Sequence, residues 1–216
     1  MITLFIDSSR KNLSVALARS NELLSVSNVN SYSKHSNYLM KEIINILNNA
    51  KLMISDVDNV VVLNGPGSFT GVRVGVTIAK TLAWVLSKKL YQLTALEALA
   101  VGVKEEVIIT VIPDKKDASY VGVYEGDKKF EDYLLINDDK LNFRDKRITI
   151  SCMDENDFVI NLKEKLALSN AISLKVLDDY DYLKVINYAL TKESINPHIA
   201  APVYLKKIDA EKQWWL

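Results

Sequence analysis

A glycine-rich segment, GPGSFTGVRVG at residues 65–75, is the densest pattern in this chain that could bind a ligand. A glycine-rich turn before a helix can hold an anion, because free backbone N–H groups and the helix dipole both point at the loop. The spacing does not fit a nucleotide P-loop, since Val72 and Arg73 follow Gly71 where that loop has lysine and serine or threonine. It does not fit a dinucleotide fingerprint either, since three residues rather than two separate Gly67 from the next glycine. A ligand or partner contact remains one interpretation of this segment.

The same segment also has the composition of a tight turn between a strand and a helix. Two of its glycines can adopt the positive φ angles that other residues avoid, and Ser68 or Thr70 can cap the helix. This second interpretation predicts a structural loop made of Gly65, Gly67, Ser68 and Gly71. Both interpretations stay open at the level of the sequence.

Residues that usually build catalytic or metal sites are scarce. The two histidines, His35 and His198, lie far apart in the sequence, so they form no metal-binding pair on one helix face. The single cysteine, Cys152, excludes an intramolecular disulfide and is interpreted as a small buried hydrophobe in the apolar run 148–152. No G-x-S-x-G nucleophile elbow is present. We therefore predict no catalytic residue, no bound metal and no cofactor.

The composition is that of a globular protein. The chain has 216 residues, of which 49% are hydrophobic and 25% charged, enough for one or two domains with a core. Twenty-seven basic and 27 acidic residues cancel, so no global field attracts nucleic acid or an anionic membrane. The start of the chain, MITLFIDSS, has no signal-type leader, and no window resembles a membrane span. These features predict a cytoplasmic protein.

Apolar periodicity predicts a mixed α/β order in each half of the chain. In the first half we expect strands at 2–6, 13–18, 23–29, 57–63 and 90–93, and helices at 35–50, 69–87 and 95–102. In the second half we expect strands at 107–112, 120–124, 130–136, 148–152 and 172–176, and helices at 157–167 and 180–190.

The second half thus repeats the first, without a convincing first helix. Two such units in tandem, each a mixed sheet with packed helices, describe the ribonuclease-H-like architecture of the actin-like ATPase superfamily. We expect the units at residues 1–104 and 105–216, with a C-terminal tail able to pack back on the first unit.

An aspartate stands at the end of the first strand of each half, Asp7 and Asp114. In actin-like ATPases these hairpins wrap the phosphates of ATP and need small residues. The first hairpin, with Ser8 and Ser9, meets that requirement, but the second has Lys115, Lys116 and Asp117 and no glycine. We interpret both aspartates as structural turn and strand-end residues.

The helix predicted after the glycine-rich segment is too apolar for an ordinary surface helix. Apolar residues cover more than half of its circumference, and its narrow polar stripe contains Arg73, Thr77 and Lys80 and continues to Trp84. The helix at 35–50 has a second apolar pair, Met40 and Ile44, beside its core face. The two helices either pack only within the chain or together present an apolar surface to a partner.

Residues 65–75, preceded by VVVLN and followed by a helix ending in AKTLAW, resemble the hallmark segment of the TsaB (YeaZ) family. The likeness extends to IDSS, SVAL, HSNYLMKEI, LTALEALA and PVYLKKIDAE elsewhere in the chain. The resemblance implies an actin-like, non-catalytic subunit in bacterial synthesis of N6-threonylcarbamoyladenosine at position 37 of tRNA. The catalytic paralogue of that family binds a metal through two histidines four residues apart, where this chain has His35 and Leu39.

The resemblance also implies the partners. The chain is expected to bind the catalytic TsaD-type paralogue through the helices that begin near Ser36 and Phe69, with a TsaE-type ATPase docking on the pair. It is expected to meet tRNA only through that complex and to form a homodimer through the same helices when alone. The predicted partner interface consists of Ser36, Met40, Ile44, Phe69, Thr70, Val72, Arg73, Val76, Thr77, Lys80 and Trp84.

Two other function classes remain as alternatives. The duplicated hairpins would also suit an actin-fold ATP-binding kinase or ATPase, which micromolar binding of Mg-ATP would favour. A peptidase has less support, because the sequence offers neither a nucleophile–base pair nor metal ligands.

Overall fold

The computed structural model describes residues 1–30, 35–115, 118–125, 128–135, 141 and 143–205. Its contacts divide the chain into two compact units. The first combines Met1–Gly102 with Tyr180–Pro202, and the second contains Val103–Asp179 and the described residues that follow Pro202.

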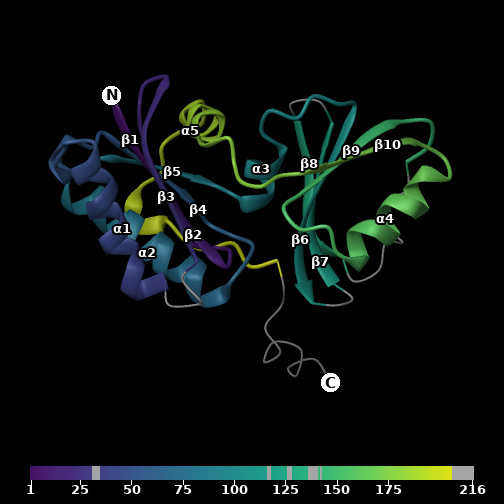
Figure 1. Cartoon of the computed structure of the whole chain (residues 1–216), viewed down its shortest axis with the longest axis horizontal. Coiled ribbons are helices and arrows are strands. Elements are labelled where there is room, and N and C mark those ends of the chain that lie inside the picture. The colour runs from purple at the N-terminus through teal and green to yellow at the C-terminus, as the bar shows by residue number, and fades with distance from the viewer. Residues whose placement is uncertain (31–34, 116–117, 126–127, 136–140, 142, 206–216) are drawn as a thin grey trace. The chain divides into compact units, whose positions relative to one another are not determined.

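The first unit is built on a five-stranded mixed sheet with the strand order β3-β2-β1-β4-β5 (Figure 1). Strands β1, β4 and β5 are parallel, and β2 is antiparallel to both of its neighbours. The strands are β1 (Ile2–Asp7), β2 (Asn12–Arg19), β3 (Glu22–Asn30), β4 (Asn59–Leu63) and β5 (Lys89–Leu93).

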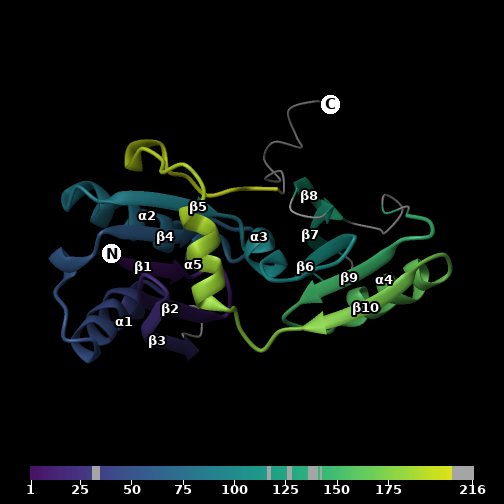
Figure 2. The same cartoon turned by 90° about the horizontal axis from the view of Figure 1, so that it is seen from above.

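Helices cover both faces of this sheet. Helices α1 (His35–Asn49) and α2 (Phe69–Val85) pack together on one face, where they enclose an apolar core with Leu4 and Ile6 of β1. Side chains alternate along a strand, so Phe5 points to the opposite face. Helix α5 (Tyr182–Leu190) contacts the same sheet (Figures 1 and 2). Phe5 packs edge-on against Tyr180 and Tyr182 at the start of this helix.

The remaining elements of the first unit are short. They are the 3-10 turns η1 (Ile54–Asp56) and η3 (Pro197–Ile199) and the helix α3 (Ala95–Ala100). Thr94 caps α3 in a reciprocal capping box with Glu97, and Glu97 also pairs with Lys192 in the segment after α5.

The second unit contains a second five-stranded sheet, ordered β10-β9-β6-β7-β8. Its elements are β6 (Val107–Lys115), β7 (Ala118–Glu125), β8 (Lys128–Leu135), β9 (Arg147–Cys152), α4 (Asp157–Ala167) and β10 (Ala171–Val176). Helix α4 buries Val159, Leu162 and Leu166 in a core with the sheet. Cys152 is fully buried in that core, as predicted, and burial raises the pKa of its thiol to about 11.

The two sheets share one topology, which confirms the predicted α/β fold with an internal duplication. In each, the first strand pairs antiparallel with the second and parallel with the fourth, and the fifth strand lies beside the fourth. The second copy was predicted to lack the first helix. The corresponding position lies between β8 and β9, where residues 136–140 and 142 are outside the described part of the chain.

The structure differs from the sequence-based expectations in several details. Helix α5, counted with the second half, contacts the first sheet, because Tyr180 and Tyr182 pack on Phe5. Strand β4 begins at Asn59 rather than at residue 57. Asp114 lies within β6, at an irregularity in the pairing with β7, and not in a turn after the strand.

Candidate functional site

The glycine-rich segment packs directly against the turn between β1 and β2. The backbone N–H of Ser68 donates to the carbonyl of Ser9 at 2.7 Å, and the hydroxyl of Ser8 donates to the carbonyl of Gly71 at 2.7 Å. A Cβ atom on Gly67 would lie 2.3 Å from the Ser9 carbonyl oxygen, and one on Gly75 would lie 2.2 Å from Ser8 Oγ. Glycine is therefore required here by close approach to the first hairpin.

The backbone of the loop has the geometry of a structural turn. Gly65 has a φ of 101° and Gly67 a φ of 156°. The hydroxyl of Ser68 accepts a hydrogen bond from the Gly71 N–H at 3.2 Å and caps α2. These contacts favour the structural interpretation of the loop.

The carboxylate of Asp7 is fully buried and is engaged by its own turn. Its Oδ1 accepts from the N–H of Ser9 at 2.8 Å and from the Ser9 hydroxyl at 2.6 Å, and its Oδ2 accepts from Nε of Arg10 at 2.9 Å. Arg10 in turn lies 4.4 Å from the centre of the Tyr180 ring. Asp7 thus closes the β1–β2 turn, which agrees with its interpretation as a structural residue.

In the second unit, Asp114 accepts a hydrogen bond from the hydroxyl of Tyr120 at 3.3 Å. Lys116 and Asp117 of the predicted hairpin lie outside the described residues.

The exposed sides of α1 and α2 carry most of the predicted interface residues. Exposed large apolar side chains lie on both helices: Met40 (38%), Ile44 (51%), Phe69 (50%) and Trp84 (60%). Ser36, Thr70, Arg73 and Thr77 are exposed as well. The guanidinium of Arg73 stacks 3.7 Å from the centre of the Phe69 ring, one helical turn away. We call this surface the α1–α2 face; it consists of these eight residues.

Two of the predicted partner-interface residues lie in the core instead. Val72 and Val76 are only 3% and 2% exposed and pack in the core of the first unit. Their prediction as interface residues is wrong, because they share a helical stripe with Ala79 and Ala83 that faces the sheet.

Lys80, a third predicted contact, is half-buried. Its ammonium group donates to the carbonyl of Ala200 at 3.2 Å, so it fastens another part of the chain to α2.

Sequence reasoning missed three residues near Trp84. Val85 follows Trp84 in the sequence and is exposed at the end of α2. His198 packs edge-on against the Trp84 ring with a centroid distance of 5.5 Å, and the neighbouring Ile199 is 73% exposed. No local signal could have indicated the last two, because they are 114 and more positions away from Trp84 in the sequence.

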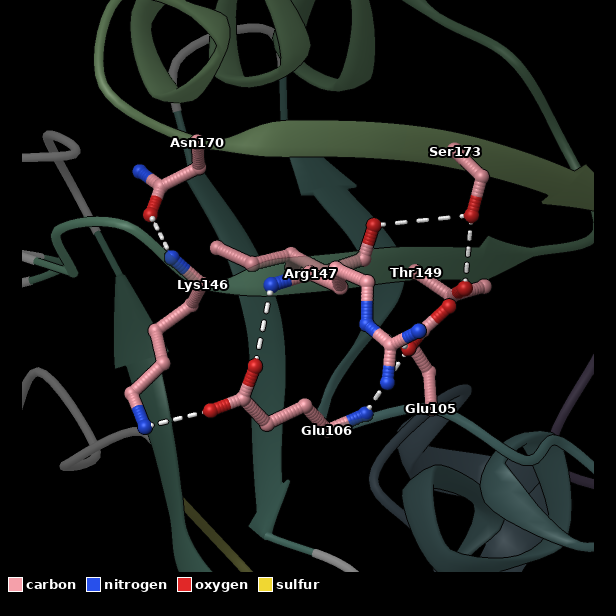
Figure 3. A network of polar contacts seen from close by, with 8 residues as sticks. Glu105, Glu106, Lys146, Arg147, Thr149, Asn170 and Ser173 are labelled. Carbon is pink, nitrogen blue, oxygen red and sulfur yellow. Dashed lines mark hydrogen bonds and ion pairs between the residues drawn. The ribbon is translucent and has the colours of Figure 1, made fainter.

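The second unit contains a polar network at the starts of its strands (Figure 3). The carboxylate of Glu106 accepts from Lys146 Nζ at 2.5 Å and from the N–H of Arg147 at 3.2 Å, while Glu105 pairs with the Arg147 side chain at 3.4 Å. The hydrogen bond from Lys146 lowers the pKa of Glu106, and the same bond raises the pKa of Lys146. This exposed network holds the starts of β6 and β9 together and has the contacts of a structural element.

Within the described ranges, no three histidine, cysteine, aspartate or glutamate side chains gather closely enough to hold a metal ion. In the same part of the chain, no helix has both the length and the apolar character needed to cross a membrane.

Comparisons with known proteins relate the chain to TsaB and TsaD proteins. The family model described as TsaD, tRNA N6-adenosine threonylcarbamoyltransferase, matches residues 29–129. The tRNA threonylcarbamoyladenosine biosynthesis protein TsaB of Bacillus subtilis is 26% identical over 224 residues, which cover 99% of this chain and 98% of that protein. The chain is similar to TsaB over its full length.

Solved structures agree with this similarity at the level of the fold. YeaZ from Pseudomonas aeruginosa superposes with a TM-score of 0.75 at 20% identity, covering 94% of this chain and 99% of that one. Component A of (R)-2-hydroxyglutaryl-CoA dehydratase from Acidaminococcus fermentans superposes with a TM-score of 0.53 at 12% identity, covering 88% of this chain and 97% of that one. The chain thus has the actin-like fold of two tandem units.

Proposed function

We propose that this TsaB-family chain acts in the biosynthesis of threonylcarbamoyladenosine on tRNA as a non-catalytic assembly subunit. The role in this biosynthesis follows from the family, whose Bacillus subtilis member is named for it. The observation that carries the assembly role is the set of exposed apolar side chains on two adjacent helices, Met40 and Ile44 on α1 and Phe69 and Trp84 on α2. An exposed surface with several large apolar side chains is a feature of interaction sites on globular proteins.

The absence of a catalytic role is supported by the state of the first hairpin. Both oxygens of the Asp7 carboxylate are engaged by Ser9 and Arg10. In the glycine-rich loop, the backbone N–H of Ser68 already donates to the carbonyl of Ser9 in the same hairpin. A phosphate or a magnesium-bound water would have to displace these internal bonds before it could use the site.

The partner that fits this face is a TsaD-type paralogue. The TsaD family model matches residues 29–129, a range that contains both α1 and α2. A paralogue with the same two helices would pair equivalent surfaces, much as two copies of this chain would pair around a two-fold axis. We therefore propose the paralogue as the physiological partner and a homodimer through the same face when the chain is alone.

The remaining parts of the proposal follow the resemblance. The first unit carries the partner face, a TsaE-type ATPase docks on the pair, and the paralogue transfers threonylcarbamoyl to adenosine 37 of the tRNA. The net formal charge of zero fits a subunit that meets tRNA only through the complex. We propose that the complex works in the cytoplasm, where its tRNA substrate is found.

The test is the affinity of a Trp84→Asp variant for the TsaD-type paralogue, measured by calorimetry after circular dichroism has confirmed the fold. Trp84 is exposed, so the substitution should leave the fold intact. Placing a carboxylate in an apolar contact should weaken binding by roughly thirtyfold or more, about 2 kcal/mol. The matched control is Leu168→Asp, an equally apolar and 88% exposed position in the second unit, which should bind normally. Unchanged affinity of folded Trp84→Asp would contradict the proposed face.

The retained small residues of the first hairpin, Ser8 and Ser9, favour one alternative, an actin-fold ATP-binding kinase or ATPase. Calorimetry with Mg-ATP separates the two proposals. Micromolar binding to the isolated chain, lost in Asp7→Asn, would support the alternative.

A further inference from the structure

We propose that residues 195–201, which we call the C-terminal strap, form a third element of the partner face beside α1 and α2. This inference rests on the proposed function, because it assumes a partner at the α1–α2 face. It adds a segment far away in the sequence and gives Lys80 a positioning role.

The strap is fastened to the first unit along its length. At its start, Ile195 bridges to Leu90 of β5, and its N–H donates to the Leu90 carbonyl at 2.8 Å. In its middle, the side chain of Asn196 caps η3 by accepting from the His198 N–H at 2.9 Å. In Figures 1 and 2 this yellow segment runs beside α2 and β5.

Three side chains then hold two consecutive carbonyls at the end of the strap. Lys80 Nζ donates to the Ala200 carbonyl at 3.2 Å. Gln92 Nε2 and Asn64 Nδ2 donate to the Ala201 carbonyl at 3.3 and 3.4 Å. Ala200 itself is buried in the core shared with α2, so the strap is docked by apolar packing as well as by hydrogen bonds.

The exposed residues of the strap lie next to Trp84, the residue whose substitution tests the proposed partner face. The rings of His198 and Trp84 are in contact, with centroids 5.5 Å apart. A partner that buries Trp84 must therefore also approach His198. Ile199, the next residue, is 73% exposed although both ends of the strap are fixed.

A fixed strap suits binding, because a segment that is already ordered loses little conformational entropy when a partner covers it. The occupant we infer is the same paralogue that covers Trp84, with an apolar surface that reaches past the end of α2 onto η3. In this arrangement Lys80 is a positioning residue: it holds the Ala200 carbonyl and acts through the strap.

The test compares two strap variants with Trp84→Asp, using the full chain and the paralogue. Ile199→Asp should lower the affinity about tenfold. Lys80→Met keeps the aliphatic stem but removes the donor to Ala200; it should weaken binding several-fold, and Lys80→Arg, which keeps a donor, should restore it. Leu168→Asp is again the control, and thermal unfolding midpoints verify that each variant is folded.

The outcomes separate this inference from the proposed function. If Trp84→Asp abolishes binding while folded Ile199→Asp stays within twofold of wild type, the strap proposal is overturned and the proposed function stands. If none of the three substitutions alters affinity, both fall. If Lys80→Arg binds the paralogue as weakly as Lys80→Met does, and Ile199→Asp also lowers the affinity, the strap is a contact element and the positioning role of Lys80 is overturned.

Discussion

Helices α2 and α4 occupy the same topological position, each following the fourth strand of its own sheet, yet their surfaces differ. Helix α4 buries a stripe of three apolar residues and carries four charged residues among its eleven. Helix α2 has two charged residues among seventeen and exposes Phe69, Trp84 and Val85. A helix that is charged outside its buried stripe is an ordinary surface helix, whereas one that is apolar on both sides is suited to a partner. The two copies therefore share a fold but differ in the surface of this helix, and the exposed apolar residues of α2 suit the proposed partner face.

The loops before these two helices differ in the same way. Both helices are capped by a side chain, Ser68 for α2 and Asn156 for α4. The residues before α4, Met153 to Asn156, include no glycine, whereas the loop before α2 presses Gly67 against the backbone of Ser9. The cap is thus a general requirement of the helix, and the glycines are a requirement of the close contact with the first hairpin.

The largest expected effect separates the two sides of α2. Val76→Asp places a carboxylate in the core of the first unit, so we expect the free energy of unfolding to fall by about 4 kcal/mol or more. Urea unfolding followed by circular dichroism measures this loss. The exposed Trp84→Asp variant is the control and should unfold near the wild-type urea concentration. Equal stability of the two variants would show that the division of α2 into a core side and a partner side is wrong.

A smaller effect is expected at the contact between α2 and the first hairpin. In Gly75→Ala the new Cβ would meet Ser8 Oγ at 2.2 Å and disturb its hydrogen bond to Gly71, so we expect a loss of about 2 kcal/mol. Removing the hydroxyl by Ser8→Ala leaves the nearest contact at the Ser8 Cβ, 3.5 Å away. In that background Gly75→Ala should cost much less, since alanine also favours helix.

Four urea unfolding curves complete this double-mutant cycle. Additive losses, with no coupling between the two positions, would contradict the steric explanation of the glycine.

The smallest effect is expected at the polar network of the second unit. Because Lys146 lowers the pKa of Glu106 in the folded chain, the pair stabilises the fold above the ordinary pKa of a glutamate, and this contribution disappears as the pH falls through the lowered value. Glu106→Gln should remove this part of the acid dependence, slightly lowering the thermal unfolding midpoint at neutral pH but not in acid. High salt should shrink the difference, since the pair is exposed. An equal deficit at every pH would mean that packing, and not charge, is responsible.

Most of the fold was predictable from local sequence. Apolar runs between turn residues located all ten strands named above, and the periodicity of 157–167 gave the bounds of α4. The starts of α1 and α2 at residues 35 and 69 were also predicted, because strong helical periodicity follows polar or glycine-rich segments there. Such signals depend on neighbouring residues, which the sequence lists directly.

The candidate site was only partly predictable. Helical spacing indicates an apolar α2, but the pairing of Val72 and Val76 with the core depends on which side of α2 meets the sheet. Lys80 could be expected to be a surface cation, yet it holds a carbonyl 120 positions away. Its partner Ala200 lies in a segment whose own sequence gives no sign of where it docks.

The sequence by itself determined the resemblance to TsaB and the order of strands and helices, because both follow from residues close together in the chain. Only the tertiary structure decided that residues from Tyr180 to Pro202 join the first unit, that residue 67 must be glycine because it lies against the backbone of Ser9, and that His198 lies against Trp84. These three facts depend on packing between segments distant in sequence, such as Tyr180 and Tyr182 on Phe5. The free energy of such contacts depends on shape and burial in the folded chain, so the local sequence does not predict them.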